Sequence, residues 1–142
     1  MPNLTVLLPS WAPLLLGVLR IVAMVNFISH GTQKTLGYPP TIPPFAWPPL
    51  LQTAGWIEIV FGTLVLVGLF TRPAAFILCG EMAVAYFRTH NPRDFWPLLN
   101  GGEITVLYCF FFLYLVAAGP GGLSLDGLLY QRKLRPMVSS NA

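Results

Sequence analysis

Four long apolar runs, separated by short polar or proline-rich segments, dominate the hydrophobic pattern of this chain. A helix that spans a membrane needs about 20 predominantly apolar residues. The runs therefore predict an all-α integral membrane protein, a four-transmembrane-helix bundle in a single domain over residues 1–142. A tail over residues 123–142 is predicted to be interfacial or cytoplasmic, with a short amphipathic helix capped by Ser124. The predicted spans are residues 13–36, 50–70, 74–90 and 102–118.

Composition agrees with this class. Hydrophobic residues make up 55% of the 142 residues and charged residues only 9%, whereas soluble domains carry about 25% charged residues. The formal net charge of +3 therefore indicates no nucleic-acid partner, and the lipid bilayer is the expected one. The N-terminal residues show no basic region and no small-residue cleavage site, so the first span is expected to act as its own insertion signal.

The placement of basic residues predicts an orientation. With four spans, both termini and the turn at residues 71–73 lie on one side of the membrane, and the two longer loops lie on the other. The side with the termini carries more positive charge, because Asp94 and Glu103 offset part of the basic residues on the loop side. The positive-inside rule then places both termini in the cytoplasm. Four tryptophans near the span ends predict an aromatic belt at the two interfaces.

Ionisable residues inside the apolar runs are the candidates for chemistry, because they are costly in hydrocarbon. On a helical wheel of the first run, His30 and Lys34 share one face with two amide side chains, and Arg20 lies at its edge. That face is predicted to point toward protein. In the second run, Glu58 lies on the same side as two glycines, and small residues let a neighbouring helix approach closely. His30 and Glu58 are the candidate catalytic residues, since each sits well inside an apolar run.

Depth along the predicted helices sorts these groups into two layers. Arg20 and Glu81 lie at comparable depth toward the inner side and are predicted to form a structural ion pair. Toward the outer side, a polar pocket is predicted beneath the two irregular loops. Its candidate ligand-binding residues are Lys34, Arg88, His90 and Glu103.

Each candidate also has a structural interpretation. His30 and Glu58 would serve equally well as partners in interhelical hydrogen bonds. Lys34 lies near a helix end and would reach the interface by snorkelling. Glu103 follows Asn100 by three residues, which is the spacing of a capping box.

Metal and thiol chemistry find little support in the residue spacing. No pair of candidate ligands has the spacing of a motif such as H-E-x-x-H, so no metal site is predicted. Cys79 and Cys109 lie far apart in apolar runs and form no C-x-x-C motif. This favours two buried thiols over a dithiol centre, and a disulfide requires that two helices bring the cysteines together.

Three segments carry a family resemblance. They are "LRIVAMVNFISHGTQKTLG", "GWIEIVFGTLVLVGLFTRPAA" and "NGGEITVLYCFFFLYLVAAGPGGLSLDGLL". In this order they resemble the DoxX family of small bacterial membrane proteins, over about Leu19–Leu129, whereas the proline-rich loop at Tyr38–Pro49 departs from the family pattern. The resemblance implies a four-helix bundle in the bacterial inner membrane, and no catalytic role is carried over from it. The positions typical of the family are His30, Lys34, Glu58, Arg72, Glu103 and Asp126.

The DoxX family is related to the DoxD subunit of thiosulfate:quinone oxidoreductase, and this relation implies a redox role. One hypothesis is a redox-linked subunit that binds a quinone or a small sulfur compound in the outer pocket, where His30 and Glu58 exchange protons. An equal alternative is a non-catalytic accessory subunit of a larger membrane complex. The expected protein partner is a larger membrane redox complex or a second copy of the chain in a homo-oligomer. A third hypothesis is a small-solute or proton pathway through the two ionisable layers. Whether the chain is an enzyme stays open.

Overall fold

The computed structural model describes residues 11–42 and 45–139, with side chains described as far as Arg132. This part of the chain is helical and contains no strand, which confirms the predicted all-α class. A π-helical turn, η2 (Tyr86–His90), continues the third long helix, and a short helix, α4 (Pro97–Asn100), precedes the fourth. The longer helices are α1 (Ala12–Leu36), α2 (Pro49–Val67), α3 (Thr71–Ala85), α5 (Glu103–Ala118) and the C-terminal α6 (Leu125–Ser139).

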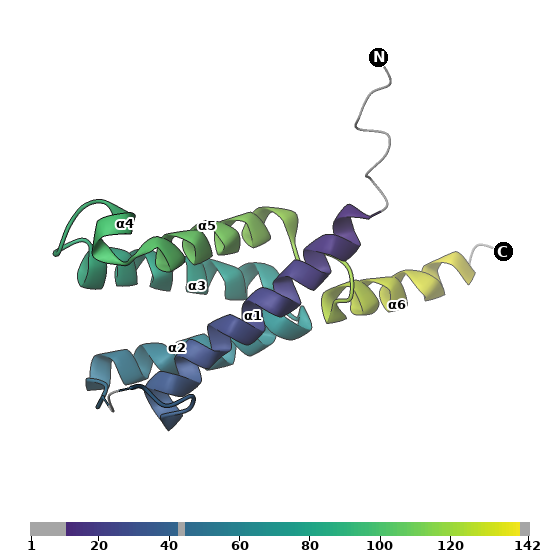
Figure 1. Cartoon of the computed structure of the whole chain (residues 1–142). Coiled ribbons are helices and arrows are strands. Elements are labelled where there is room, and N and C mark those ends of the chain that lie inside the picture. Colours follow the sequence, from purple (N-terminus) through teal and green to yellow (C-terminus); the bar gives the residue numbers. More distant parts are fainter. Residues whose placement is uncertain (1–10, 43–44, 140–142) are drawn as a thin grey trace, which may run out of the picture.

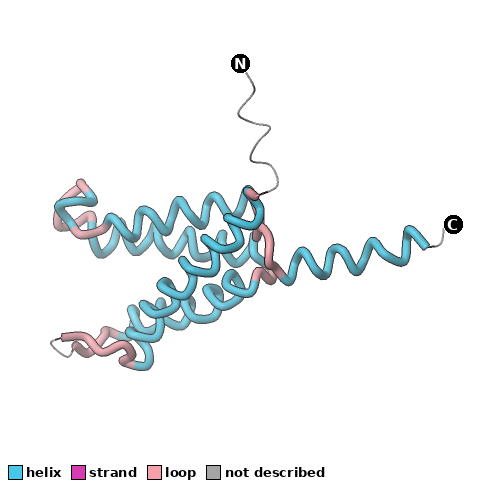
Figure 2. The backbone as a smooth tube through the Cα atoms, turned by 45° about the vertical axis from the view of Figure 1, so that its right-hand side comes forward, coloured by secondary structure: helices cyan, strands magenta, loops and turns pink. Residues whose placement is uncertain are grey.

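The four long helices before α6 form two antiparallel hairpins (Figure 1). Helix α1 packs against α2, α3 packs against α5, and α2 and α3 are joined by a tight turn. Figure 2 shows the hairpins meeting where α6 begins and separating toward the opposite end. We call the first end the short-turn end, since it holds residues 68–70 and 119–124. The opposite end, with residues 37–48 and 91–102, is the long-loop end.

Backbone conformation explains where the helices stop. Helix α1 covers the predicted span almost to the residue and ends at Leu36, because Gly37 takes a left-handed conformation with φ of 69°. Helix α2 ends at Val67, before the predicted limit of residue 70, because Gly68 also takes a left-handed conformation with φ of 69°. Glycine adopts this conformation without the steric penalty that a Cβ would bring. The third helix starts earlier than predicted, at Thr71, and η2 carries it to His90, the predicted end.

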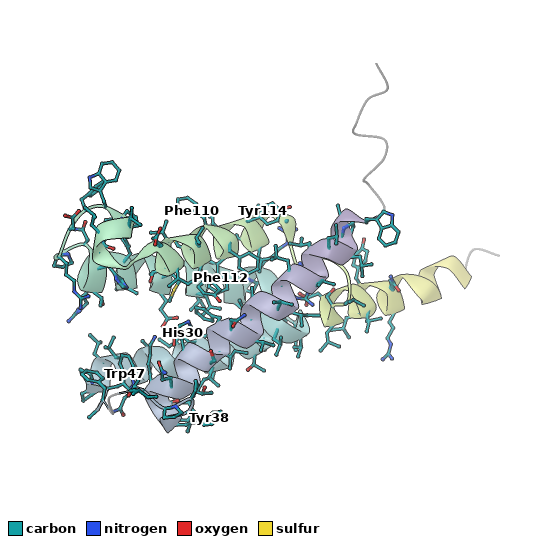
Figure 3. The ribbon with its side chains drawn as sticks, in the orientation of Figure 1. His30, Tyr38, Trp47, Phe110, Phe112 and Tyr114 are labelled. Atoms are coloured by element: carbon teal, nitrogen blue, oxygen red, sulfur yellow. The ribbon has the colours of Figure 1, made fainter. Side chains whose placement is uncertain are left out.

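The buried core joins the two hairpins. The ring of Phe27 on α1 packs edge-on against Tyr108 and Phe112 on α5, with centroid distances of 4.9 Å to each. Figure 3 shows Phe112 on the inner side of α5, whereas Phe110 and Tyr114 point away from the core. Large apolar side chains are exposed on the outer faces of all four long helices, which is unusual for a soluble protein and suits contact with lipid. Helices α1 and α2 are long and apolar enough to cross a membrane.

Arg20 ties the short-turn end together. Its guanidinium is fully buried and donates hydrogen bonds to the carbonyl oxygens of Pro120 at 2.7 Å and Leu123 at 2.8 Å. The structure does not form the predicted ion pair with Glu81, whose two carboxylate oxygens have no hydrogen-bond partner among the described residues. The reason is that both terminal nitrogens of the guanidinium donate to carbonyls of the segment after α5, which are 100 and 103 positions away along the chain.

Two further side chains satisfy helix ends at the short-turn end. Arg72 donates to the carbonyl oxygens of Val116 and Ala117, both at 2.7 Å, in the last turn of α5. The Asp126 carboxylate accepts hydrogen bonds from the backbone N–H groups of Phe70 at 2.9 Å and Thr71 at 3.0 Å, where α3 begins. Helix ends leave such groups without partners inside the helix. These two family-typical positions therefore have a structural explanation.

Helix α6 begins with the predicted cap. The Ser124 hydroxyl accepts a hydrogen bond from the backbone N–H of Gly127 at 3.2 Å, which is the geometry of an N-cap residue. The side chains of Lys133 and Arg135 on this helix lie outside the described residues.

Candidate functional site

An ion pair joins α1 to α2 toward the long-loop end. The Lys34 ammonium nitrogen lies 2.5 Å from Oε1 of Glu58. The Lys34 side chain is 18% exposed and the Glu58 side chain only 2%. Two residues that the sequence predicted for one outer pocket are therefore in direct contact, and each neutralises the other's charge.

Two glycines make room for this pair. A Cβ atom at Gly31 would lie 2.8 Å from the carbonyl oxygen of Gly55 and 3.1 Å from Cβ of Glu58. A Cβ atom at Gly55 would lie 2.9 Å from the carbonyl oxygen of Gly31 and 3.0 Å from Cβ of Lys34. Side chains on a helix lean toward its N-terminus, so those of Lys34 and Glu58 lean toward each other across antiparallel helices. The close approach predicted for the glycine side of α2 is confirmed.

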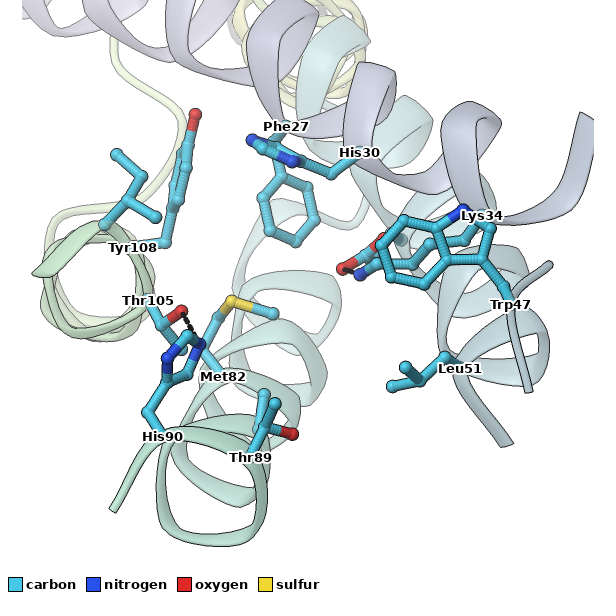
Figure 4. Close-up of a pocket in the computed structure, with 13 residues that line it drawn as sticks. Phe27, His30, Lys34, Trp47, Leu51, Met82, Thr89, His90, Thr105 and Tyr108 are labelled. Atoms are coloured by element: carbon cyan, nitrogen blue, oxygen red, sulfur yellow. Dashed lines mark hydrogen bonds and ion pairs between the residues drawn. The ribbon is translucent and has the colours of Figure 1, made fainter. Parts of the chain in front are cut away.

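The pair forms part of the wall of a cavity of about 360 Å³ between the hairpins, which we call the central cavity (Figure 4). His30 from α1 and His90 from η2 line it together with the ion pair. Three aromatic side chains complete much of the wall: Phe27, Trp47 and Tyr108. Ring surfaces and proton-carrying groups thus face the same space.

The hydrogen bonds of His90 assign its tautomer. Nδ1 lies 3.2 Å from the carbonyl oxygen of Asn100, and Nε2 lies 3.3 Å from the hydroxyl oxygen of Thr105. A carbonyl oxygen only accepts, so Nδ1 carries the proton of the neutral ring and Nε2 accepts from the Thr105 hydroxyl. His30 is exposed, its ring lies at the cavity wall beside Phe27, and it has no hydrogen-bond partner in the part of the chain that the structure describes.

Glu58 presents one oxygen to the interior without a partner. Oε1 is paired with Lys34, whereas Oε2 is buried and has no hydrogen-bond partner among residues 11–42 and 45–132. Buried polar atoms are nearly always hydrogen-bonded. Because Glu58 lines the central cavity, its unpartnered buried oxygen is suited to receive an O–H or N–H group of a bound molecule once a small rotation of the side chain exposes it.

A second cavity, of about 380 Å³, lies between α2 and α3 on the other side of the ion pair, and we call it the lateral groove. Lys34 and Glu58 line it too, so the pair separates the two spaces. Glu81 and Arg88, which are seven residues apart along α3 and η2, also line this groove. The predicted outer pocket is thus divided into two, and most of the lateral lining is apolar.

Glu103 belongs to neither lining. It is exposed in the first turn of α5, where a carboxylate is favourable near the positive end of the helix dipole. The capping box with Asn100 is not formed, because Gly102 is the N-cap residue and the Asn100 side-chain oxygen accepts from the Gly102 N–H at 2.7 Å.

Trp47 and Tyr108 are among the cavity residues that the sequence did not predict for the site. Trp47 was assigned to an interfacial belt, but it is half-buried and faces the central cavity. Tyr108 lines the same cavity and donates a hydrogen bond from its hydroxyl to the carbonyl oxygen of Ala23 at 3.2 Å. A tyrosine in the middle of an apolar run was a usable signal, because a buried hydroxyl needs a partner. For Trp47 the sequence held no such signal.

Comparison with known proteins places the chain in a family. The family model described as DoxX matches residues 15–91. An uncharacterized protein of Haemophilus influenzae is 44% identical, covering 88% of this chain and 98% of the relative. An uncharacterized membrane protein of Mycobacterium tuberculosis is 30% identical, covering 87% of this chain and 91% of the relative. No solved structure gives a significant match. The chain is a membrane protein of the DoxX family.

Proposed function

We propose that this protein is a four-span inner-membrane protein that binds the ring of a quinone in the central cavity and exchanges protons with it. One observation carries this proposal. Oε2 of Glu58 is a buried acceptor without a partner in the described chain, and the Glu58 residue lines a cavity that three aromatic rings also line. A quinol offers a flat ring and hydroxyl donors, which match these two features.

The proposed membrane placement rests on helix length and surface. The helical stretch Thr71–His90 is about 30 Å long at 1.5 Å per residue, which matches the hydrocarbon thickness. Helix α5 is about 24 Å long by the same measure, and the exposed aromatic and leucine side chains around α4 adjoin its first turn. The charge distribution favours both termini in the cytoplasm, with α6 on the inner membrane surface. The central cavity then opens toward the outer side.

The charges around the cavity favour a neutral ligand over an anion. Lys34 is already neutralised by Glu58, so a small sulfur oxyanion meets no uncompensated cation there. Arg88 lines the lateral groove and not the central cavity. A neutral ring avoids the cost of bringing a further charge into a poorly hydrated space.

Three groups are placed to hold protons beside such a ring. Oε2 of Glu58 accepts a hydrogen bond from a hydroxyl of the bound molecule. His30 offers ring nitrogens that have no partner in the described structure, and Nε2 of His90 accepts a proton when the Thr105 hydroxyl turns away. A histidine and a carboxylate are suited to proton exchange near neutral pH. The quinone supplies the two-electron chemistry, and its electron source is a partner or a further group in the chain.

Trp47 supplies an intrinsic probe of binding. The purified protein in lipid nanodiscs is titrated with a short-chain ubiquinone analogue, and tryptophan fluorescence is followed. We expect saturable quenching that is largely lost in Trp47→Phe. The matched control is Trp56→Phe, which removes an exposed tryptophan of α2 outside the cavity lining and should leave the saturable component intact. Quenching that rises linearly and is equal in both variants would remove the proposal.

The accessory-subunit hypothesis has one supporting observation. The long-loop end exposes a group of large apolar side chains around α4, namely Phe95, Trp96, Leu98 and Leu99. Such a group is suited to a protein partner as well as to lipid. Assembly of an unchanged complex by Glu58→Gln protein that has lost the quinone signal would favour an accessory role. The inner ionisable layer gives no support to a proton pathway, because Arg20 is held by loop carbonyls.

A further inference from the structure

The two cysteines of the chain face each other between α3 and α5. The sulfur atoms of Cys79 and Cys109 are 3.8 Å apart, and both thiols are free and partly buried. The Cys109 sulfur also lies 3.6 Å from the carbonyl oxygen of Cys79, to which its S–H can donate. A disulfide bond is about 2.0 Å long, so a small rotation of each side chain brings the sulfurs to bonding distance. Since the chain has only two cysteines, no other thiol competes for either.

A third cavity, of about 420 Å³, adjoins Cys109, and we call it the aromatic cavity. Its lining is almost wholly apolar and includes Tyr86, Phe87, Phe95, Trp96 and Phe110. Cys109 and Phe110 face it, whereas Tyr108 of the same helix faces the central cavity. The two cavities therefore lie on different sides of α5.

We infer that Cys79 and Cys109 form a reversible disulfide that ties α3 to α5, and that the oxidant is a lipid-soluble quinone bound in the aromatic cavity. Flat rings pack favourably against aromatic side chains, and a site among membrane-facing helices excludes polar oxidants such as glutathione disulfide. In the reaction two S–H bonds break and one S–S bond forms. The two electrons and two protons pass to the two carbonyl oxygens of the quinone, which leaves as a quinol. This inference does not rest on the central cavity.

The test uses the full chain in nanodiscs, reduced and then freed of reductant. After incubation with a short-chain ubiquinone analogue, intact mass spectrometry should show the loss of two hydrogen atoms. Both thiols should become inaccessible to maleimide after denaturation, and a phosphine reductant should restore them. Cys79→Ser and Cys109→Ser should show no such mass loss. A mass gain of one quinone, or an unchanged mass with both thiols labelled, would overturn the inference.

Two variants of α5 test the place of the oxidant. Val106→Phe fills part of the aromatic cavity, and Leu107→Phe adds the same ring on the exposed face outside the cavity linings. We expect Val106→Phe to slow oxidation by the quinone on the order of 10-fold, because the bound oxidant loses its position beside the thiol. Leu107→Phe should keep the wild-type rate, and diamide should oxidise all three proteins equally. Equal quinone rates in the two variants would contradict the assigned site, and failure of diamide in the wild type would contradict the pairing itself.

Discussion

Gly31 and Gly55 face each other so closely that a Cβ on either would meet the carbonyl oxygen of the other, at 2.8 Å and 2.9 Å. Their contact sets the distance between α1 and α2, and it decides whether the Lys34 and Glu58 side chains reach each other. The close contact of the two glycines is therefore a steric condition for the Lys34–Glu58 ion pair. Both pairs lie toward the long-loop end, where the hairpins separate and where the central cavity is found.

Replacing Gly55 with alanine should therefore destabilise the protein. The added methyl group would lie 2.8 Å from the γ-methyl of Thr35, 2.9 Å from the carbonyl oxygen of Gly31 and 3.0 Å from Cβ of Lys34. A backbone atom and atoms near the backbone yield poorly, and overpacking of this kind costs about 1–3 kcal/mol. The matched control is Gly80→Ala in α3, where a Cβ meets nothing within 4 Å, and where alanine gains up to about 1 kcal/mol of helix propensity. Size-exclusion chromatography after heating measures how much folded protein remains, and the temperature at which half is lost is compared between the two variants. Equal midpoints would contradict the close contact.

A double-mutant cycle tests the Lys34–Glu58 pair. Lys34→Met leaves the buried Glu58 carboxylate without its partner, and breaking a buried pair costs about 3–5 kcal/mol. The double variant Lys34→Met with Glu58→Gln should be less damaged than the sum of the two single changes, since no charge remains buried. Unfolding free energies of the four proteins give the coupling directly. Additive losses would show that the two residues do not interact.

Arg20 and Glu81 should respond very differently to substitution. Arg20→Lys removes the two-pronged contact with the carbonyls of Pro120 and Leu123, and we expect a loss of about 1.5–3 kcal/mol. Glu81→Gln should not destabilise the protein, because no described group pairs with its buried carboxylate oxygens and an amide carries no charge that burial would penalise. Thermal midpoints measured side by side decide this. A loss of stability in Glu81→Gln as large as that in Arg20→Lys would support the predicted ion pair between Arg20 and Glu81.

Asp126→Ala should loosen the start of α3. It frees the backbone N–H groups of Phe70 and Thr71, at an expected cost of about 0.5–2 kcal/mol. Hydrogen exchange should accelerate at these two amides while the amides in the middle of α5 stay protected. The control is Gln131→Ala, an exposed change on the same helix α6. Unchanged exchange at Phe70 and Thr71 would rule out this capping role.

Local features of the fold were predictable from the sequence, because they depend on near neighbours. The extent of α1, the small-residue face around Glu58 and the Ser124 cap all follow from periodicity or from residues within one or two turns. The end of α2 at Val67 follows from Gly68, the glycine that begins the turn between α2 and α3. By contrast, the partners of Arg20 lie 100 and 103 positions away, and no local pattern identifies them.

The candidate site was predictable in part, for the same reason. The polar face of α1 identified His30 and Lys34, and the isolated acid in an apolar run identified Glu58. Which of them meet depends on the separation and register of the helices, so the direct pairing of Lys34 with Glu58 and the division into two cavities were not predicted. The register of α3 against α5 likewise brings Cys79 to Cys109, which the spacing in the sequence argued against.

Photoaffinity labelling tests directly whether a quinone ring binds in the central cavity between the hairpins. The wild-type protein in nanodiscs is irradiated with an azido-quinone, and the labelled residues are mapped by mass spectrometry with and without an excess of the unlabelled analogue. We expect label on side chains that line the central cavity and neither of the other two cavities, such as Trp47, Ile104 and Tyr108, and protection of these positions by the competitor. Label confined to outward-facing side chains such as Phe76 and Leu107, without protection, would contradict it.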